Sequence, residues 1–296
     1  MWILSEKKIH DLHLLIMKLA AIFILYYPEK EIISHIERIY SDIDYLFLYK
    51  NSEIPTSLLN AIHSKFDAKL IWLGNEQNNG IAKALNDGLF SAGKYGCEWL
   101  VTMDQDSYID SDIFSELKTR AAKKTDRCIL FSPDLLIRDR LFYQDNVKNY
   151  WIMTSCNFVR TSCVDLVGTF NEDYFIDGVD IEYCLRLQQK GFIFEIEKDL
   201  IGHHALGHRI EANLFGKKIF FTSHIPLRKY YIFRNYLDIV FKKKFLLRVR
   251  FKILYALFIR LYESLLFEPK KFQNLKMINM GFWHFLFSVK GKYSNG

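Results

Sequence analysis

The chain has 296 residues, of which half are apolar, a quarter are charged and 16% are aromatic. This composition excludes a disordered chain, a collagen-like fibre and a small disulfide-stapled protein, and it suffices for one large domain or a domain with an appendage. The five cysteines form no Cys-x-x-Cys pair, so we expect reduced thiols in a cytosolic protein.

The net charge of +6 is unevenly distributed along the chain. From Arg228 to the end there are 15 basic residues against three acids, a net of +12, whereas the first 227 residues hold 25 basic and 31 acidic residues. An acidic body with a basic, aromatic tail predicts chemistry in the first part and attachment to an anionic partner in the second.

Short apolar runs alternate with segments of helical spacing through most of the chain before this tail. We predict strands over 19–27, 45–49, 70–73, 99–103, 129–136, 151–159 and 192–196, and helices over 29–39, 55–65, 81–94 and 179–190. This alternation favours βαβ units and an α/β fold with a mainly parallel sheet. Since no run of about 18 apolar residues occurs, no membrane-spanning helix is predicted.

In an open α/β sheet, ligands bind beyond the carboxyl ends of the strands, so the segments that follow each strand are candidate sites. These segments are Tyr26-Tyr27-Pro28, Lys50-Asn51-Ser52, Asn78-Asn79-Gly80 and Asp104-Gln105-Asp106. The sequence contains neither GxGxxG nor GxxxxGK[ST], which argues against a dinucleotide-dependent enzyme and against a P-loop nucleotidase.

Only one of the three Asp-x-Asp pairs in the sequence, Asp104 with Asp106, directly follows an apolar strand. Alternate residues of an extended chain point the same way, so these two carboxylates can converge on one Mg²⁺ or Mn²⁺. Such an ion would bridge to a nucleotide diphosphate and neutralise the charge of the departing group. Judged by position alone, a polar turn with solvated acids explains the pair equally well.

The segments Asn79-Gly-Ile-Ala-Lys-Ala-Leu-Asn-Asp-Gly-Leu and Glu98-Trp-Leu-Val-Thr-Met-Asp-Gln-Asp-Ser resemble the family 2 glycosyltransferases, which have the GT-A fold. Among these they are similar to the bacterial rhamnosyltransferases, whose metal motif usually has the form Asp-Gln-Asp-Ser. The resemblance runs from about Ala20 to Asn235. It implies a GT-A domain over residues 19–227, an N-terminal extension over 1–18 and a helical, basic and aromatic tail over 228–296.

The resemblance also assigns a catalytic base. Residues 170–186 look like the family's acceptor-side segment, in which an acidic residue at the start of a helix takes the proton from the acceptor hydroxyl. Where the family often has Glu-Asp, this chain has Val179-Asp180, so Asp180 inherits the role and Asp177 is the runner-up. Without the resemblance, both acids are also suited to capping a helix.

The third metal ligand implied by the resemblance is His204. His204-Ala-Leu-Gly207 matches the family's His-x-x-Gly, in which the histidine completes the metal or diphosphate site, whereas His203 and His208 do not fit this spacing. Imidazole suits Mn²⁺ beside carboxylates. A histidine that packs as an ordinary residue is the alternative.

On the donor side, Tyr26 occupies the position of a tyrosine in relatives, where it would stack on the nucleobase or simply pack. Lys50 replaces the aspartate that commonly contacts the base. Lys50 could instead contact a phosphate of the donor. Contact with the base would then fall to Asn51 or Asp44.

The start of the helix over 81–94 is the expected diphosphate site. Asn79 and Lys83 lie there, where backbone N–H groups and a cation favour an anion, and Asp104 would contact the diphosphate through the metal. A solvated helix face is the alternative for Lys83.

Between Arg228 and Lys252, nine basic residues interleave with aromatic residues and leucines. This pattern suits an anionic membrane surface. Nucleic acid is disfavoured as a partner because no nucleic-acid motif accompanies the pattern and the acidic body would repel phosphates. A solvated basic face is the third alternative.

Taken together, the resemblance implies an inverting, metal-dependent glycosyltransferase that moves L-rhamnose from dTDP-L-rhamnose to a lipid-linked oligosaccharide. The product would be a bacterial surface polysaccharide such as O-antigen or capsule, and the enzyme would be cytoplasmic and peripheral on the inner face of the cell membrane. One alternative is another donor, giving a galactofuranosyl- or hexosyltransferase. The other is an inactive basic peripheral protein of the same fold, for which Lys50 and Val179 are the hints.

Overall fold

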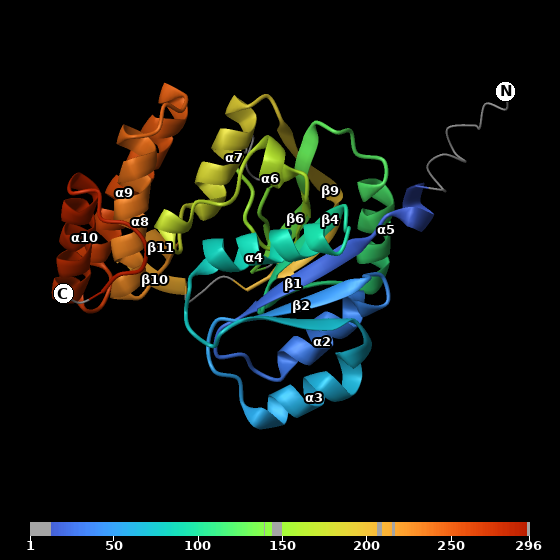
Figure 1. Ribbon diagram of the computed structural model, residues 1–296. Helices are drawn as coiled ribbons and strands as arrows, with labels where there is room; N and C mark the ends of the chain where they lie inside the picture. The colour runs from blue at the N-terminus through green and yellow to red at the C-terminus, as the bar shows by residue number, and fades with distance from the viewer. Residues whose placement is uncertain (1–12, 139, 144–149, 206–208, 215–216, 295–296) are drawn as a thin grey trace.

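The structure, a computed structural model, describes residues 13–294 except residue 139 and the segments 144–149, 206–208 and 215–216. A twisted central sheet carries helices on both faces, and three C-terminal helices stand together at one side of it (Figure 1). The predicted α/β class is therefore confirmed.

The first four strands of the sheet are parallel and lie in the order β3-β2-β1-β4. They and their helices are β1 (Leu19–Leu25), α2 (Glu31–Tyr40), β2 (Tyr45–Lys50), α3 (Thr56–Phe66), β3 (Leu70–Gly74), α4 (Ile81–Lys94) and β4 (Trp99–Asp104). Since the chain steps outward to β3 and then returns to β4, right-handed crossovers place α2 and α3 on one face and α4 on the other. All seven residues of β1 are buried, as expected of a central strand covered on both faces.

The second half of the sheet mixes strand directions in the order β4-β8-β6-β9-β5. Its elements are β5 (Ser107–Ile109), α5 (Ser111–Ala121), β6 (Cys128–Ile137), β7 (Arg140–Leu141), β8 (Asn157–Arg160), α6 (Cys163–Leu166), α7 (Val179–Gln189) and β9 (Ile193–His204). Strand β8 is antiparallel to both β4 and β6, and β5 is antiparallel to β9. A separate hairpin of β10 (Arg209–Leu214) and β11 (Lys217–Thr222) precedes the C-terminal helices.

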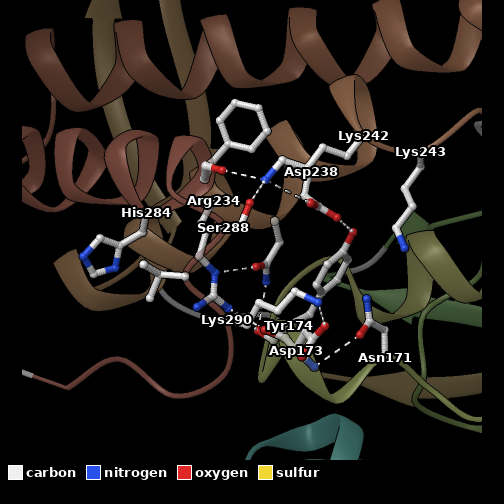
Figure 2. A pocket seen from close by; sticks show the side chains of 13 residues that line it. Asn171, Asp173, Tyr174, Arg234, Asp238, Lys242, Lys243, His284, Ser288 and Lys290 are labelled. Carbon is white, nitrogen blue, oxygen red and sulfur yellow. Dashed lines mark hydrogen bonds and ion pairs between the residues drawn. The ribbon is translucent and has the colours of Figure 1, made fainter.

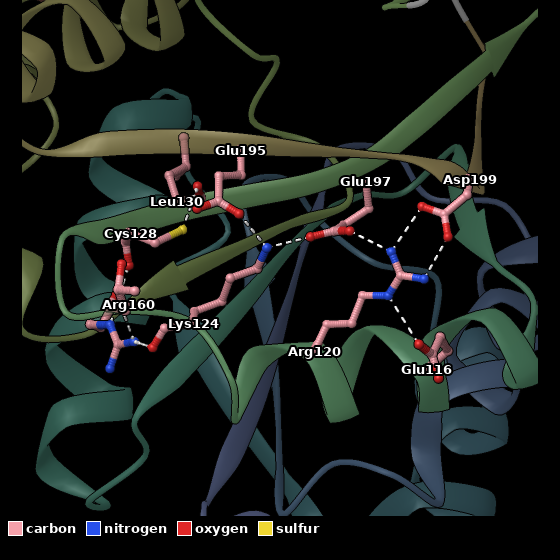
Figure 3. A network of polar contacts seen from close by, with 10 residues as sticks. Glu116, Arg120, Lys124, Cys128, Leu130, Arg160, Glu195, Glu197 and Asp199 are labelled. Carbon is pink, nitrogen blue, oxygen red and sulfur yellow. Dashed lines mark hydrogen bonds and ion pairs between the residues drawn. The ribbon is translucent and has the colours of Figure 1, made fainter. Parts of the chain in front are cut away.

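Two strand predictions in this half were wrong in their bounds. The strand predicted over 151–159 covers only β8, because Cys156 adopts a left-handed conformation with φ of 60° that interrupts the extended chain. The strand predicted over 192–196 continues to His204 as β9. Its charged residues are compatible with a strand because they pair with Arg120 and Lys124 at the end of α5, as Figure 3 shows.

The tail forms three helices, α8 (Pro226–Phe241), α9 (Leu247–Leu266) and α10 (Lys271–Leu286). Helix α8 begins with proline in its first turn, where the missing N–H is not needed. Apolar residues of all three helices form a small core of their own: Ile232, Phe233, Leu237, Leu257, Ile278 and Phe285. Over the described ranges, no helix has both the length and the apolar character needed to cross a membrane.

The N-terminal extension is described only from His13 onward. The His13 ring lies 2.7 Å from the Glu98 carboxylate and 3.0 Å from the carbonyl oxygen of Ala122. That residues 1–16 are dispensable, and that the chain divides after residues 18 and 227, remain predictions. Residues 1–12 lie outside the described part.

Helix α10 approaches α8 closely at Gly281. A β-carbon at this position would lie 2.6 Å from the carbonyl oxygen of Tyr230, so α10 would have to move away from α8. We therefore expect Gly281→Ala to lower the free energy of unfolding by about 1–3 kcal/mol, measured by urea denaturation.

Gly93 provides a matched control, since it is exposed on α4 and a β-carbon there meets nothing within 4 Å. Gly93→Ala should raise stability by up to about 1 kcal/mol through helix propensity. Equal effects of the two substitutions would contradict close packing of α10 on α8.

Candidate active site

Three potential metal ligands meet where β4 and β9 end and β5 begins. Asp104 is the last residue of β4, Asp106 lies in the turn to β5, and His204 is the last residue of β9. Antiparallel pairing of β5 with β9 sets Ser107 opposite His204 and so brings the histidine beside the two acids. One ligand atom from each of the three lies within 4.8 Å of the others, a spacing at which they could hold one metal ion.

Two buried serines, Ser107 and Ser155, position this cluster through hydrogen bonds. The backbone N–H of Asp104 donates to Oγ of Ser155 at 3.2 Å, and Ser155 in turn donates to Oγ of Ser107 at 2.8 Å. Ser107 Oγ lies 2.6 Å from Nδ1 of His204, which orients the imidazole. These supporting serines carried no motif signal apart from Ser107, the last residue of Asp-Gln-Asp-Ser.

The electrostatics of the cluster favour a cation. Burial raises the pKa of the Asp104 carboxyl, and the nearby carboxylate of Asp106 raises it further. His204 and Arg228 act in the opposite direction. Two acids held together, one of them largely desolvated, are stabilised in their charged forms by a divalent ion.

The acceptor-side acids differ sharply in their surroundings. Asp180, the second residue of α7, accepts one hydrogen bond, from the N–H of Ile181 at 2.9 Å. Burial raises its pKa to about 6, and the charge of Asp177 contributes to the rise. Asp177 instead binds Arg228 through both carboxylate oxygens, at 3.1 Å from Nε and 2.5 Å from Nη2.

Helix α8 clamps the loop that carries these acids. The side-chain amide nitrogen of Asn235 lies 2.7–2.9 Å from three carbonyl oxygens of the loop, those of Tyr174, Ile176 and Asp177, and shares its two N–H groups among them. The guanidinium of Arg234 donates to the carbonyl of Asp173 at 2.9 Å. Figure 2 shows Arg234 and Asp173 beside a small polar cavity of about 190 Å³.

The donor-side residues are tied to the same loop. Asn51 is buried, and its Oδ1 accepts a hydrogen bond from the N–H of Asn79 at 2.8 Å. Immediately afterwards, Gly80 packs so closely on Phe175 that a β-carbon would lie 2.5 Å from the Phe175 carbonyl oxygen. The start of α4 therefore packs directly against the acceptor-side loop.

Tyr26 lies next to the metal motif. Its N–H donates to Oε1 of Gln105 at 2.7 Å, and the Gln105 amide donates back to the Tyr26 carbonyl at 2.9 Å. The Tyr26 ring is about half exposed and meets Tyr27 edge-on. Gln105, which we had not singled out, thus joins the end of β1 to the metal motif.

Each of the two donor-side lysines, Lys50 and Lys83, forms an ion pair with a nearby acidic side chain. Lys83 pairs with Asp87 one turn along α4. Lys50 donates to Glu76 at 3.0 Å and lies over the Trp72 ring. That Lys83 binds the diphosphate stays a prediction.

One proposed substitute for base recognition is wrong. Asp44 accepts a hydrogen bond from the N–H of Leu19, the first residue of β1. It therefore lies at the amino end of the sheet, opposite to the end where Asp104 stands.

Three basic residues assigned to a membrane surface are also placed differently from the prediction. Arg228 binds Asp177 in the candidate site, Lys229 is buried against Glu268, and Arg234 is buried in the α8 clamp. The Arg228–Asp177 contact joins positions 51 residues apart, so no local pattern announced it.

Comparison with solved structures identifies the fold class as GT-A, the fold of nucleotide-sugar glycosyltransferases, and so confirms the prediction. Residues 1–349 of Staphylococcus aureus TarS in complex with UDP-GlcNAc match with a TM-score of 0.59 at 13% identity, over 92% of this chain and 82% of that one. The corresponding UDP complex matches with a TM-score of 0.53 at 15% identity, over 86% of this chain and 77% of that one.

A curated sequence relative is dTDP-rhamnosyl transferase RfbF of Shigella flexneri. It is 30% identical in an alignment 186 residues long that covers 56% of this chain. The chain spans about 60% of the length of this relative. No family model matches. The two comparisons together confirm the resemblance to rhamnosyltransferases and the GT-A fold that the motifs carry.

The geometry predicts a metal-binding experiment. Replacing Asp104 or Asp106 with Asn should weaken Mn²⁺ binding at least tenfold, measured by electron paramagnetic resonance of free Mn²⁺, because each removes a charged ligand from the cluster. Asp112→Asn, at an exposed acid on α5, should leave binding unchanged. Similar losses in all three variants would show that Mn²⁺ binds by general surface charge.

Proposed function

We propose that the protein is a glycosyltransferase that moves L-rhamnose from dTDP-L-rhamnose to a hydroxyl of an acceptor sugar, with inversion at the anomeric carbon. The observation that carries this proposal is the convergence of Asp104, Asp106 and His204 at the carboxyl edge of a GT-A sheet, with Asp180 in the adjoining loop and helix. The similarity to a dTDP-rhamnosyl transferase supports the choice of donor.

The three clustered ligands would hold Mn²⁺ or Mg²⁺, which when bound neutralises the charge that develops on the departing nucleotide diphosphate. Asn51 and Asn79 shape the loop beside this site, and Tyr26 offers an exposed ring to a nucleobase. UDP and UDP-GlcNAc in the TarS complexes support a nucleotide diphosphate as the donor's leaving group. Because Lys50 is paired with Glu76, base recognition would differ from that of relatives with aspartate at this position.

Asp180 is the better candidate for the catalytic base. With a pKa of about 6 it is ionised at neutral pH yet basic enough to accept a proton from the acceptor hydroxyl as its oxygen attacks the anomeric carbon. The bond between that carbon and the diphosphate oxygen breaks on the opposite face. Asp177 is held by both of its oxygens on Arg228, so it has less capacity to take a proton.

The acceptor would be a lipid-linked oligosaccharide in the synthesis of a bacterial surface polysaccharide, and the protein would be peripheral on the inner face of the membrane. After the buried residues of α8 are removed from the predicted set, exposed basic side chains remain at Lys242, Lys244, Arg248 and Lys252. These support attachment to anionic lipid.

Donor turnover tests the proposal. The wild-type protein with Mn²⁺ should release dTDP from dTDP-L-rhamnose faster than it releases UDP from UDP-sugars. Asp180→Asn should lower transfer by a factor on the order of 10² or more and leave dTDP binding intact, because only the proton acceptor is lost. Wild-type kcat/KM should decline as the pH falls below about 6, where Asp180 becomes protonated.

Asp177→Asn is the control for this experiment, because it weakens the contact with Arg228 without removing the base. Its rate should still fall at low pH, even if the rate is lower throughout. The fall should begin at a slightly lower pH than in the wild type, because the charge of Asp177 no longer raises the pKa of Asp180. Loss of transfer in Asp177→Asn with retention in Asp180→Asn would move the base to Asp177. No turnover of any nucleotide sugar would favour the inactive homologue.

Attachment to membranes has its own test. The protein should sediment with vesicles of phosphatidylglycerol, be released as salt rises, and not sediment with phosphatidylcholine vesicles. Replacing Lys244, Arg248 and Lys252 with Gln should weaken this binding about tenfold or more, at roughly 1 kcal/mol for each charge. Equal sedimentation with both vesicle types would contradict electrostatic attachment.

A further inference from the structure

An open apolar groove of about 840 Å³ lies among the three C-terminal helices. Its walls come from α8, α9 and α10, and ten of the twelve side chains that line it are apolar. The two exceptions are Lys276 and Asn279, both on α10. The volume is within the range of roughly 300–1,000 Å³ that is usual for sites that bind small molecules.

The helical spacing of the sequence produces this groove. On α9, Leu254, Phe258 and Leu261 follow one another at intervals of four and three residues, and on α10 Phe272, Leu275 and Phe282 do the same at three and seven. Each set forms a stripe along its helix. These stripes face a common space instead of closing on each other, so Phe258 is 63% and Phe272 82% exposed.

The C-terminal helices expose further aromatic side chains outside the groove lining, with Phe251, Tyr255, Trp283 and Phe287 each about half exposed or more. An exposed apolar groove of this size on a protein in water marks a surface that is covered in use.

The charges around the groove indicate what covers it. Helix α10 has no acidic residue, and the single acid on α9, Glu263, lines a small cavity with His224 and Lys229. Lysines border the groove instead, with Lys276 in its lining and Lys271 exposed at the start of α10. The partner should therefore combine apolar surface with negative charge, whereas a second copy of this face would bring lysines against lysines.

Helix α8 connects the groove with the candidate active site. Phe233 and Leu237 form part of the groove lining, and between them Asn235 holds the loop of Asp177. Arg228, which binds the Asp177 carboxylate, lies five residues before Phe233, or about 7.5 Å along the helix axis. The groove and the loop that carries Asp177 therefore lie on opposite sides of α8.

We propose that the groove binds the hydrocarbon chain of an anionic lipid, with lysines at its border close to the phosphate. This inference rests on the proposed function, under which the lipid is the anchor of the acceptor. Binding of the chain behind α8 then places the acceptor sugar near Asp180 and gives the enzyme selectivity for lipid-linked over free oligosaccharides.

Soluble n-alkyl phosphates with chains of 6 to 12 carbons are the probes, and calorimetry with the full-length protein measures their dissociation constants. Affinity should rise with length by up to about fourfold for each methylene, which corresponds to ~0.8 kcal/mol per buried CH₂. In a Phe258→Glu, Phe272→Glu double variant this dependence on chain length should disappear.

A Tyr255→Glu, Phe287→Glu double variant is the control. Its residues are 68% and 72% exposed and are not part of the groove lining, and it adds the same charge. It should keep the chain-length dependence. Because all four positions are exposed, both variants should fold, which thermal unfolding can check.

Three results would overturn the inference. The first is wild-type affinity that does not depend on chain length. The second is equal loss in both variants, which indicates insertion of the whole aromatic face into a bilayer. The third is a dimer in sedimentation that only the groove variant dissociates, which assigns the groove to a second copy. Release of dTDP from dTDP-L-rhamnose, measured in parallel, reports separately on the proposed function, so one can fail while the other stands.

Discussion

The hydrogen bonds from α8 to the loop before α7 hold the candidate site together. This loop contains Phe175 and Asp177 with positive φ angles of 64° and 60°. Such conformations cost about 1–3 kcal/mol each in residues other than glycine, so the surrounding structure must stabilise them. Asn235 does so by donating to three carbonyls in succession, which a side chain of another shape could not reproduce. The direction in which Asp180 points therefore depends on a helix that follows it by about fifty residues.

The same loop also sets the donor side. Its Phe175 carbonyl accepts the N–H of Ile81 at 2.8 Å and leaves no room for a side chain at Gly80, so the start of α4 is positioned by the acceptor loop. The metal cluster is positioned independently, through the pairing of β5 with β9 and the hydrogen bonds of Ser107 and Ser155. The candidate site is thus positioned by two separate sets of contacts. One fixes where a metal–diphosphate would lie, and the other fixes the base relative to the donor.

The features that sequence could predict are those with a local signature. Apolar runs and helical spacing located β1 to β4 and the helices α2, α3, α4 and α7 to within about two residues, and Asp104 with Asp106 followed from alternation at the end of a strand. Joining His204 to them required the family resemblance, since the strand pairing that brings it close spans 97 residues. The contact of Arg228 with Asp177 and the hydrogen bonds of Gln105 have no local signal at all. They arise when segments distant in sequence meet, and each of these residue types is equally common on a solvated surface.

The role of the basic residues in the tail is also hard to predict from sequence alone. The 15 basic residues after position 227 predicted an anionic partner as a group, yet they serve two different purposes. A cation inside a protein is costly unless it is paired and hydrogen-bonded, and Lys229 meets this condition through Glu268 and Ser264. Arg234 meets it through backbone carbonyls. Of the exposed cations, Lys242 and Lys290 pair with Asp238 and Asp173, and Arg248 and Lys252 lie over the ring of Tyr150. Lys276 lines the apolar groove, and Lys271 is exposed at the start of α10. Net charge cannot separate these two populations, because both contribute equally to the sum. The exposed lysines on α10 beside an uncovered apolar groove are the observation that favours the proposed lipid over a purely polar anion.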